Sequence, residues 1–207
     1  MVTKKNRKTC AQNFLEEDAN DERKFVFIDE SGFNLHLRRT MSRSARGAPS
    51  SIILPSVRGR DISLITAISR EEVLFSKPIS GPVDVTKYRD FFMGLIAKCV
   101  DKNIITRCTF IMDNARIHSA MMMREFYTEN ELTIKFLSPY SYMLNPIEFG
   151  FSKIRAGVRR KLAEGYNNGF VDLIQESTRG LSESDLRGYH NHIVRNCVKA
   201  VALEDFN

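Results

Sequence analysis

Residues 24–29 read Lys-Phe-Val-Phe-Ile-Asp, a short apolar run rich in aromatic and β-branched side chains. A run of this length that ends at an acidic residue, with Gly32 close behind, predicts a buried strand. A second run of the same kind, Cys108–Met112 (CTFIM), is followed by Asp113. The two runs therefore predict two buried strands that each lead to an aspartate.

The rest of the chain supplies the elements around these two strands. Apolar periodicity predicts further strands at residues 61–69, 72–80 and 132–137, and helices at 85–100, 119–130 and after Asn145. The adjacent strands at the start favour antiparallel pairing, and the later alternation of strand and helix favours parallel strands. The expected fold class is α/β: a ribonuclease H-like (retroviral integrase-like) mixed sheet flanked by helices, with a helical C-terminal extension.

Length and composition suit one domain with an appendage. The chain has 207 residues, of which 43% are hydrophobic and 27% charged, as in ordinary globular proteins. Residues 1–23 lack sustained apolar periodicity and are expected to be a tail or linker. Residues 24–165 are expected to form the core, and residues 166–207 a helical extension packed on it, with Ser182 capping the last helix.

Several locations are disfavoured by the sequence. No apolar run approaches the roughly 20 residues that span a bilayer, and the basic N-terminus, Met1–Lys8, has no apolar stretch after it. The four cysteines form no C-x-x-C pair, which argues against a zinc ribbon or a redox motif. We therefore expect a protein that is neither secreted nor membrane-bound, located in the nucleus if its host is eukaryotic and in the cytoplasm if bacterial.

The net charge of +6 is unevenly distributed. The stretch Ser31–Arg60, here called the arginine loop, has no acidic residue and six arginines: Arg38, Arg39, Arg43, Arg46, Arg58 and Arg60. A second acid-free stretch, residues 149–163, includes Lys153, Arg155 and Arg159. Clustered basic residues favour a polyanionic partner such as DNA, although a solvated face is the simpler interpretation of either stretch alone.

Three carboxylates are candidates for chemistry: Asp29 and Asp113 at strand ends, and Glu148 at a helix start. Functional groups of open α/β sheets gather outside the carboxyl ends of the strands. Neighbouring carboxylates repel one another unless a cation joins them, and Mg²⁺ prefers oxygen ligands. Each acid alone also has a structural explanation, which for Glu148 is a capping box with Asn145.

The flanks of the three acids carry a family resemblance. The segments 27–33 (FIDESGF), 111–118 (IMDNARIH) and 137–148 (LSPYSYMLNPIE) resemble the three motifs of the mariner-type DDE transposases. In this sequence 34 residues lie between Asp113 and Glu148, which is typical of the bacterial and eukaryotic branches that end in Glu. Arg58-Gly-Arg60 ahead of a strand is also typical, and the resemblance covers roughly residues 24–160.

The resemblance implies an enzyme, a DDE transposase. Such an enzyme cuts DNA at transposon ends and joins the free 3′-hydroxyl to target DNA, using Mg²⁺ or Mn²⁺, with two ions expected. The implied catalytic and metal-binding residues are Asp29, Asp113 and Glu148, and Asn114 and His118 are implied to support them. An alternative role for His118 is to cap or stabilise the helix that begins near Ser119. The arginine loop is expected to contact DNA phosphates or to form a contact within a homodimer.

The sequence also departs from the family pattern. Ser138 stands where the family usually has proline, and Phe149 where it usually has a polar residue, so both are expected to alter how Glu148 is presented. The helix-turn-helix modules that usually precede the catalytic domain are not seen in the 23 residues before the first strand. We therefore expect a truncated copy, an isolated catalytic domain, or a protein without site-specific binding. Two other functions stay open: a non-catalytic DNA-binding or assembly protein, and a ribonuclease H-like nuclease without joining activity.

Overall fold

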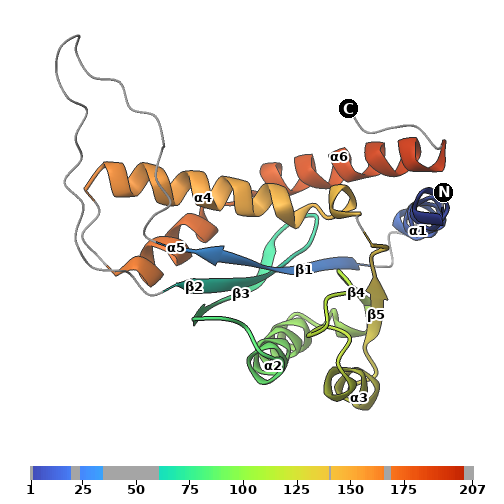
Figure 1. Ribbon diagram of the computed structural model, residues 1–207, viewed down its shortest axis with the longest axis horizontal. Coiled ribbons are helices and arrows are strands. Elements are labelled where there is room, and N and C mark those ends of the chain that lie inside the picture. The colour runs from blue at the N-terminus through green and yellow to red at the C-terminus, as the bar shows by residue number, and fades with distance from the viewer. Residues whose placement is uncertain (1, 20–23, 35–60, 140, 166–168, 203–207) are drawn as a thin grey trace, which may run out of the picture.

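A five-stranded mixed sheet forms the centre of the molecule (Figure 1). The computed structural model describes residues 2–19, 24–34, 61–139, 141–165 and 169–202. The strands are β1 (Lys24–Phe33), β2 (Ile62–Ile68), β3 (Val73–Ser80), β4 (Cys108–Met112) and β5 (Thr133–Phe136), in the order β3-β2-β1-β4-β5. The strands β1, β2 and β3 pair antiparallel, whereas β4 is parallel to both β1 and β5. The predicted mixed sheet is thus confirmed.

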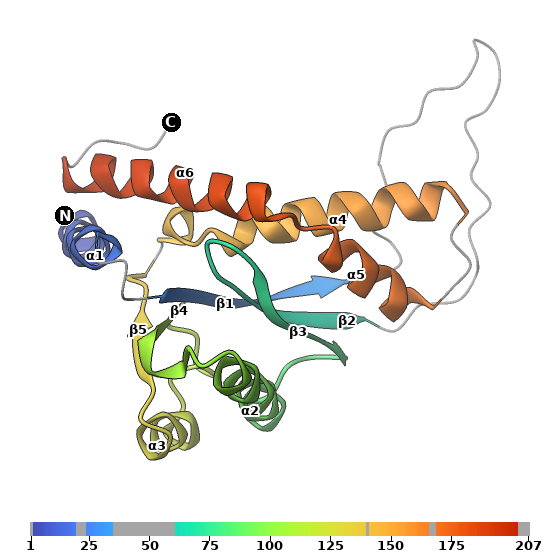
Figure 2. The ribbon, with the colours of Figure 1, turned by 180° about the vertical axis from the view of Figure 1, so that it is seen from behind.

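Helices cover both faces of this sheet (Figures 1 and 2). On one face lie α2 (Val85–Asp101) and α3 (Met121–Glu129), and on the other α4 (Ile147–Ala163), α5 (Phe170–Arg179) and α6 (Glu183–Val201). Side chains alternate along β1, so Val26 and Ile28 join the core beneath α2, and Phe25 and Phe27 join the core beneath α4. The α4 stripe formed by Ile147, Phe151, Ile154 and Val158 closes the second core.

The expected N-terminal tail is instead a helix. Residues Val2–Asp18 form α1, which packs against α6. Ala11 is fully buried, and the Phe14 ring stacks on Phe25 with 4.9 Å between ring centroids. Asp18 contacts His190 of α6 at 2.9 Å. The prediction of a tail was wrong because α1 is held by these tertiary contacts and has no regular apolar face of its own.

The C-terminal helices follow the prediction more closely. Helices α5 and α6 occupy the expected extension, and Leu173, Ile193 and Cys197 join the core beneath α4. Ser182 caps α6 and forms a capping box with Asp185, which confirms the predicted cap. The two helices therefore complete the layer that covers this face of the sheet.

Two predicted boundaries were wrong. Strand β1 does not end at Asp29, because residues 29–33 continue to pair with β2, and Asp29 lies opposite Thr66. Helix α4 begins at Ile147, so Asn145 is not its N-cap and Pro146 occupies the cap position. Asn145 nevertheless accepts a hydrogen bond from the Ile147 amide through its side-chain oxygen, at 3.3 Å.

Cys99 and Cys108 are buried free thiols. Among the helices that the structure describes, none combines the length and the apolar character needed to cross a membrane.

Candidate active site

Asp29 and Asp113 lie at the same level of two neighbouring parallel strands. The last paired residues of β1 and β4 are Phe27 and Ile111, and each aspartate follows two residues later. Because side chains alternate along a strand, Asp29 continues the row of β1 that faces α4, whereas Asp113 follows the end of β4 and its carboxylate binds His118. The local pairing of β1 with β4 therefore brings together two acids that are far apart in the sequence.

Glu148 comes to the same region from the first turn of α4. Its side chain is exposed, and the neighbouring Phe149 stacks on Tyr189 of α6 with 5.6 Å between ring centroids. The unusual Phe149 thus anchors the start of α4 to α6 while Glu148 stays on the surface. The departure from the family pattern leaves the carboxylate accessible.

The pKa of Asp29 is raised by its burial and by the charges of neighbouring acids. Burial raises the pKa of Asp29 from 3.8 to about 7. The main-chain N–H of Glu30 donates a hydrogen bond to Oδ1 of Asp29 at 2.8 Å and opposes this rise. The negative charges of Glu30, Asp113 and Glu148 add to the rise. This arrangement favours uptake of either a proton or a cation.

His118 binds the second aspartate. Its Nδ1 lies 2.7 Å from Oδ1 of Asp113, and its Nε2 lies 3.0 Å from Oε2 of Glu30. Burial alone would lower the pKa of His118, but these two bonds outweigh it and raise the pKa to about 10. The bond to His118 also holds the pKa of Asp113 below its usual range. His118 does not cap α3, which has no side-chain cap.

Asn145 was not identified as a site residue from the sequence. Its side chain is 2% exposed, and Nδ2 donates to Oδ2 of Asp29 at 3.0 Å. The same side chain accepts from the Ile147 amide at the start of α4. Asn145 therefore joins the first aspartate to the helix that carries Glu148. Its position three residues before Glu148 was the available signal, but it was interpreted as a helix cap.

The donor set suits a hard divalent cation. Asp29, Asp113 and Glu148 offer only carboxylate oxygens, the ligands that Mg²⁺ and Mn²⁺ prefer. On Asp113, Oδ1 accepts from His118 and from the Ala115 amide at 3.0 Å, and no described residue bonds Oδ2. Within the described ranges, however, no three His, Cys, Asp or Glu side chains form a ready-made metal cage. The residues fit such an ion in chemistry, and the side chains would have to turn toward it.

The basic residues near α4 differ in their surroundings. Lys153 pairs with Asp185 of α6, because five residues along a helix turn it away from the side of Glu148. Arg155 donates to the Ser31 hydroxyl and lies over the Phe33 ring, 5.9 Å from its centroid. Arg159 is exposed. Lys153 and Arg159 are thus both exposed, whereas Arg155 is half-buried against β1.

The remaining predicted residues are Asn114 and the arginines of the arginine loop. Asn114 is exposed beside Asp113. The six arginines of the arginine loop lie outside the described residues, because residues 35–60 are not among them.

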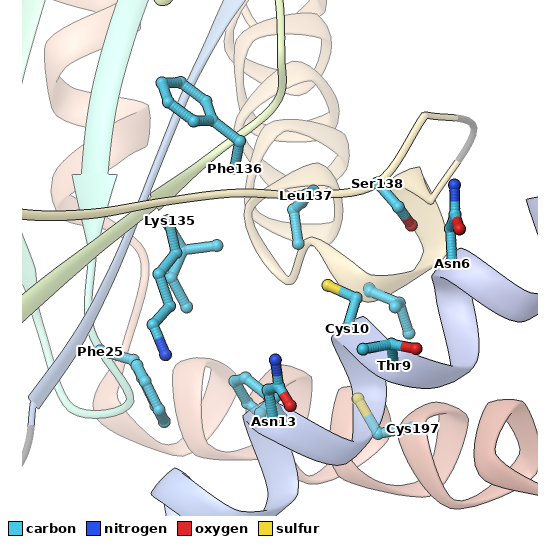
Figure 3. Close-up of a pocket in the computed structure, with 13 residues that line it drawn as sticks. Asn6, Thr9, Cys10, Asn13, Phe25, Lys135, Phe136, Leu137, Ser138 and Cys197 are labelled. Carbon is cyan, nitrogen blue, oxygen red and sulfur yellow. The ribbon is translucent and has the colours of Figure 1, made fainter. Parts of the chain in front are cut away.

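A cavity of about 470 Å³ lies away from the acids, between α1, β5 and α6 (Figure 3). Thr9 and Cys10 of α1, Lys135 of β5 and Cys197 of α6 face it, together with Leu137. None of Asp29, Asp113 and Glu148 lines this cavity. A cleft of this size suits a small ligand, whereas Asp113 and Glu148 are exposed at the surface, where a large substrate can reach them.

Comparisons with known proteins agree with the fold. The model of a family described as "DDE superfamily endonuclease" matches residues 24–165. No curated protein matches the sequence.

Among solved structures, "Structure of Mos1 transposase catalytic domain and Raltegravir with Mg" matches with a TM-score of 0.73 and 15% identity. That match covers 100% of this chain and 98% of the other. "Mos1 transposase paired-end complex with left transposon end" matches with a TM-score of 0.78 and 16% identity, covering 98% of this chain and 62% of the other. "Crystal structure of the Mos1 Strand Transfer Complex" matches with a TM-score of 0.74 and 16% identity, covering 100% and 63%.

At these identities the similarity establishes the fold, and the expected ribonuclease H-like class is confirmed. The chain spans about 62% of the protein in the paired-end complex and nearly all of the isolated catalytic domain.

Proposed function

Because the chain belongs to the DDE superfamily endonucleases, we propose that it is a transposase catalytic domain of the mariner type. It cuts DNA at transposon ends and joins the free 3′-hydroxyl to target DNA, with Mg²⁺ or Mn²⁺ as cofactor. The observation that carries this proposal is the equal level of Asp29 and Asp113 on neighbouring parallel strands, with Glu148 at the start of α4 above them.

The chain's own residues account for most of the proposed chemistry. Asp29, Asp113 through Oδ2, and Glu148 would hold the cations, and Asn145 and His118 orient the two aspartates. Divalent ions held there would help to activate the attacking hydroxyl and to stabilise the leaving oxygen in phosphoryl transfer. Arg159 lies on the side of α4 that carries Glu148 and is placed to contact a DNA phosphate.

The test is a nicking and joining assay with oligonucleotide duplexes in Mg²⁺ or Mn²⁺, with EDTA as the control. Metal-dependent nicking together with covalent joining of a labelled 3′-hydroxyl end supports the transposase. Nicking without joining would indicate a nuclease. DNA binding without nicking would indicate a non-catalytic DNA-binding or assembly protein.

The arginine loop provides a prediction about DNA affinity. Replacing Arg38, Arg39, Arg43 and Arg46 with Ala should weaken DNA binding, because fewer counterions are released from the DNA. The slope of log K against log[salt] should become shallower by about 0.9 for each phosphate that the variant no longer neutralises. Fluorescence anisotropy at several salt concentrations measures this slope.

The matched control removes four exposed arginines elsewhere: Arg70, Arg107, Arg179 and Arg195. We expect its salt slope to stay at the wild-type value. An unchanged slope in the arginine-loop variant would place that loop on a solvated surface away from DNA.

Asn145 provides a prediction that combines activity and stability. Asn145→Leu keeps the volume but leaves Oδ2 of Asp29 and the Ile147 amide without their partner. We expect cleavage to fall about 10–100-fold, as for other groups that orient metal ligands. The free energy of unfolding should fall by about 1–3 kcal/mol for the unpaired buried groups.

Initial rates and urea denaturation measure the two effects of Asn145→Leu. Asn145→Gln, which keeps both polar atoms one methylene further out, should retain more activity than the leucine variant. Equal rates in all three proteins would show that Asn145 does not orient Asp29.

A homodimer, and a location in the nucleus or the cytoplasm according to the host, remain predictions from the sequence. Sedimentation of the purified chain with and without DNA would measure whether it forms a homodimer.

A further inference from the structure

Glu30 follows the first aspartate directly but lies on the other face of the sheet. Side chains alternate along β1, so Asp29 faces α4 while Glu30 faces the layer of α2 and α3. There Oε2 of Glu30 lies 3.0 Å from Nε2 of His118. The Glu30 side chain is 29% exposed, and this bond is formed with a histidine that is completely buried.

The His118 ring is fixed on three sides. It stacks on Tyr88 with 4.5 Å between ring centroids, and Tyr88 is itself fully buried. Nδ1 contacts Oδ1 of Asp113 at 2.7 Å and the Asp113 main-chain oxygen at 3.2 Å. Carboxylate oxygens can only accept when ionised, so each ring nitrogen donates to one of the two acids. The ring therefore links β1 to the residue that follows β4.

This link determines which oxygen of Asp113 faces solvent. His118 and the Ala115 amide both bond Oδ1. The Asp113 side chain is 54% exposed, and among the described residues none contacts Oδ2. Without its bond at Nε2 the ring would lose the contact that ties it to β1, and the angle at which Nδ1 meets Oδ1 of Asp113 would be less closely fixed.

We propose that Glu30 is a positioning residue for the acidic site: it holds His118, and through His118 it sets Asp113 with Oδ2 toward the cation. The inference rests on the proposed metal-dependent function, because it assigns Asp113 as a ligand. In this proposal Glu30 acts through His118 and is not itself a ligand of the cation.

A purely stabilising role explains the arrangement less well. Buried ion pairs contribute little net stability compared with apolar residues of the same volume. The chain of bonds that begins at Glu30 ends at the half-exposed carboxylate of Asp113, outside the apolar core. The geometry therefore suits orientation of that carboxylate better than it suits packing.

The test measures Mn²⁺ affinity of the full chain without DNA, by isothermal titration calorimetry and by the electron paramagnetic resonance signal of bound Mn²⁺. Three variants separate the effect of side-chain length at position 30 from the effect of its charge. Glu30→Gln keeps an oxygen acceptor within reach of Nε2, Glu30→Asp keeps the charge but is one methylene short, and Glu30→Ala removes both. Glu129→Ala, an exposed acid of α3, is the matched control for loss of charge.

We expect Mn²⁺ affinity to depend on whether residue 30 places an oxygen within hydrogen-bond distance of Nε2 of His118, and not on the charge of residue 30. Glu30→Gln and Glu129→Ala should bind within about threefold of wild type, and Glu30→Asp and Glu30→Ala about 10–100-fold more weakly. Thermal melts without metal identify any variant that is unfolded, and Glu30→Asp and Glu30→Gln still decide the question if Glu30→Ala does not fold.

Affinity that follows charge, with Glu30→Asp like wild type and Glu30→Gln weakened, would overturn the inference. Wild-type affinity in all three variants would overturn it as well. In both cases the proposed metal site would stand as long as wild type binds Mn²⁺ and Asp113→Asn does not. No Mn²⁺ binding by wild type would instead overturn the proposed function, and this inference with it.

Discussion

Asp113→Asn is expected to abolish metal-dependent DNA cleavage while the protein stays folded. The asparagine oxygen can still accept from the Ala115 amide and from His118, so the local structure is kept. The negative charge that would bind the cation is removed. A bound cation stabilises the transition state of phosphoryl transfer by several kcal/mol. Its loss should therefore lower the cleavage rate by about 1,000-fold or more.

Asp90→Asn, an exposed aspartate on α2, is the matched control and should cleave at the wild-type rate. Single-turnover cleavage rates and circular dichroism of both variants make the comparison. Undiminished cleavage by a folded Asp113→Asn would remove this residue from the catalytic site.

Asp29→Asn is expected to change how stability depends on pH when no metal is present. The pKa of Asp29 is raised in the folded protein from 3.8 to about 7, so the folded state binds the proton more tightly than the unfolded state. Stability then falls as the pH rises from about 4 through 7, by at most about 1.4 kcal/mol for each pH unit. The asparagine variant cannot titrate and should not show this decrease.

Urea denaturation of both proteins between pH 4 and pH 8 in EDTA measures the difference. The stability of wild type relative to Asp29→Asn should decrease as the pH rises. Millimolar Mg²⁺ should restore the stability of wild type at pH 8, because the cation favours the charged carboxylate. Parallel pH profiles for the two proteins would show that the pKa of Asp29 is not raised in the folded protein.

Much of the sheet follows from local sequence patterns. The runs 24–29 and 108–112 are strands because short apolar runs of β-branched and aromatic residues bury well on both faces. The apolar stripe of α2, from Tyr88 to Cys99, predicts a helix because its residues recur every three or four positions and so share one face. Asp29 and Asp113 stand at the ends of such runs, which predicts that the two acids lie near each other at the carboxyl ends of neighbouring strands.

Other features depend on contacts between distant segments. Helix α1 is held by Phe25 and His190, and neither contact leaves a periodic signal in residues 2–18. β1 extends past Asp29 because β2 pairs with it, although the acid and Gly32 suggest an end. The bonds from Asn145 to Asp29 and from His118 to Glu30 join residues 116 and 88 positions apart. Side-chain pairing of this kind is determined by the assembled fold.

The measurement that tests the metal-dependent active site most directly is anomalous diffraction from crystals soaked in Mn²⁺. We predict anomalous peaks within about 2.5 Å of carboxylate oxygens of Asp29, Asp113 and Glu148, with two peaks about 4 Å apart. Crystals of Asp113→Asn soaked in the same way should lack at least one of them. Strong Mn²⁺ peaks elsewhere on the protein, with none among these three carboxylates, would contradict the proposed active site.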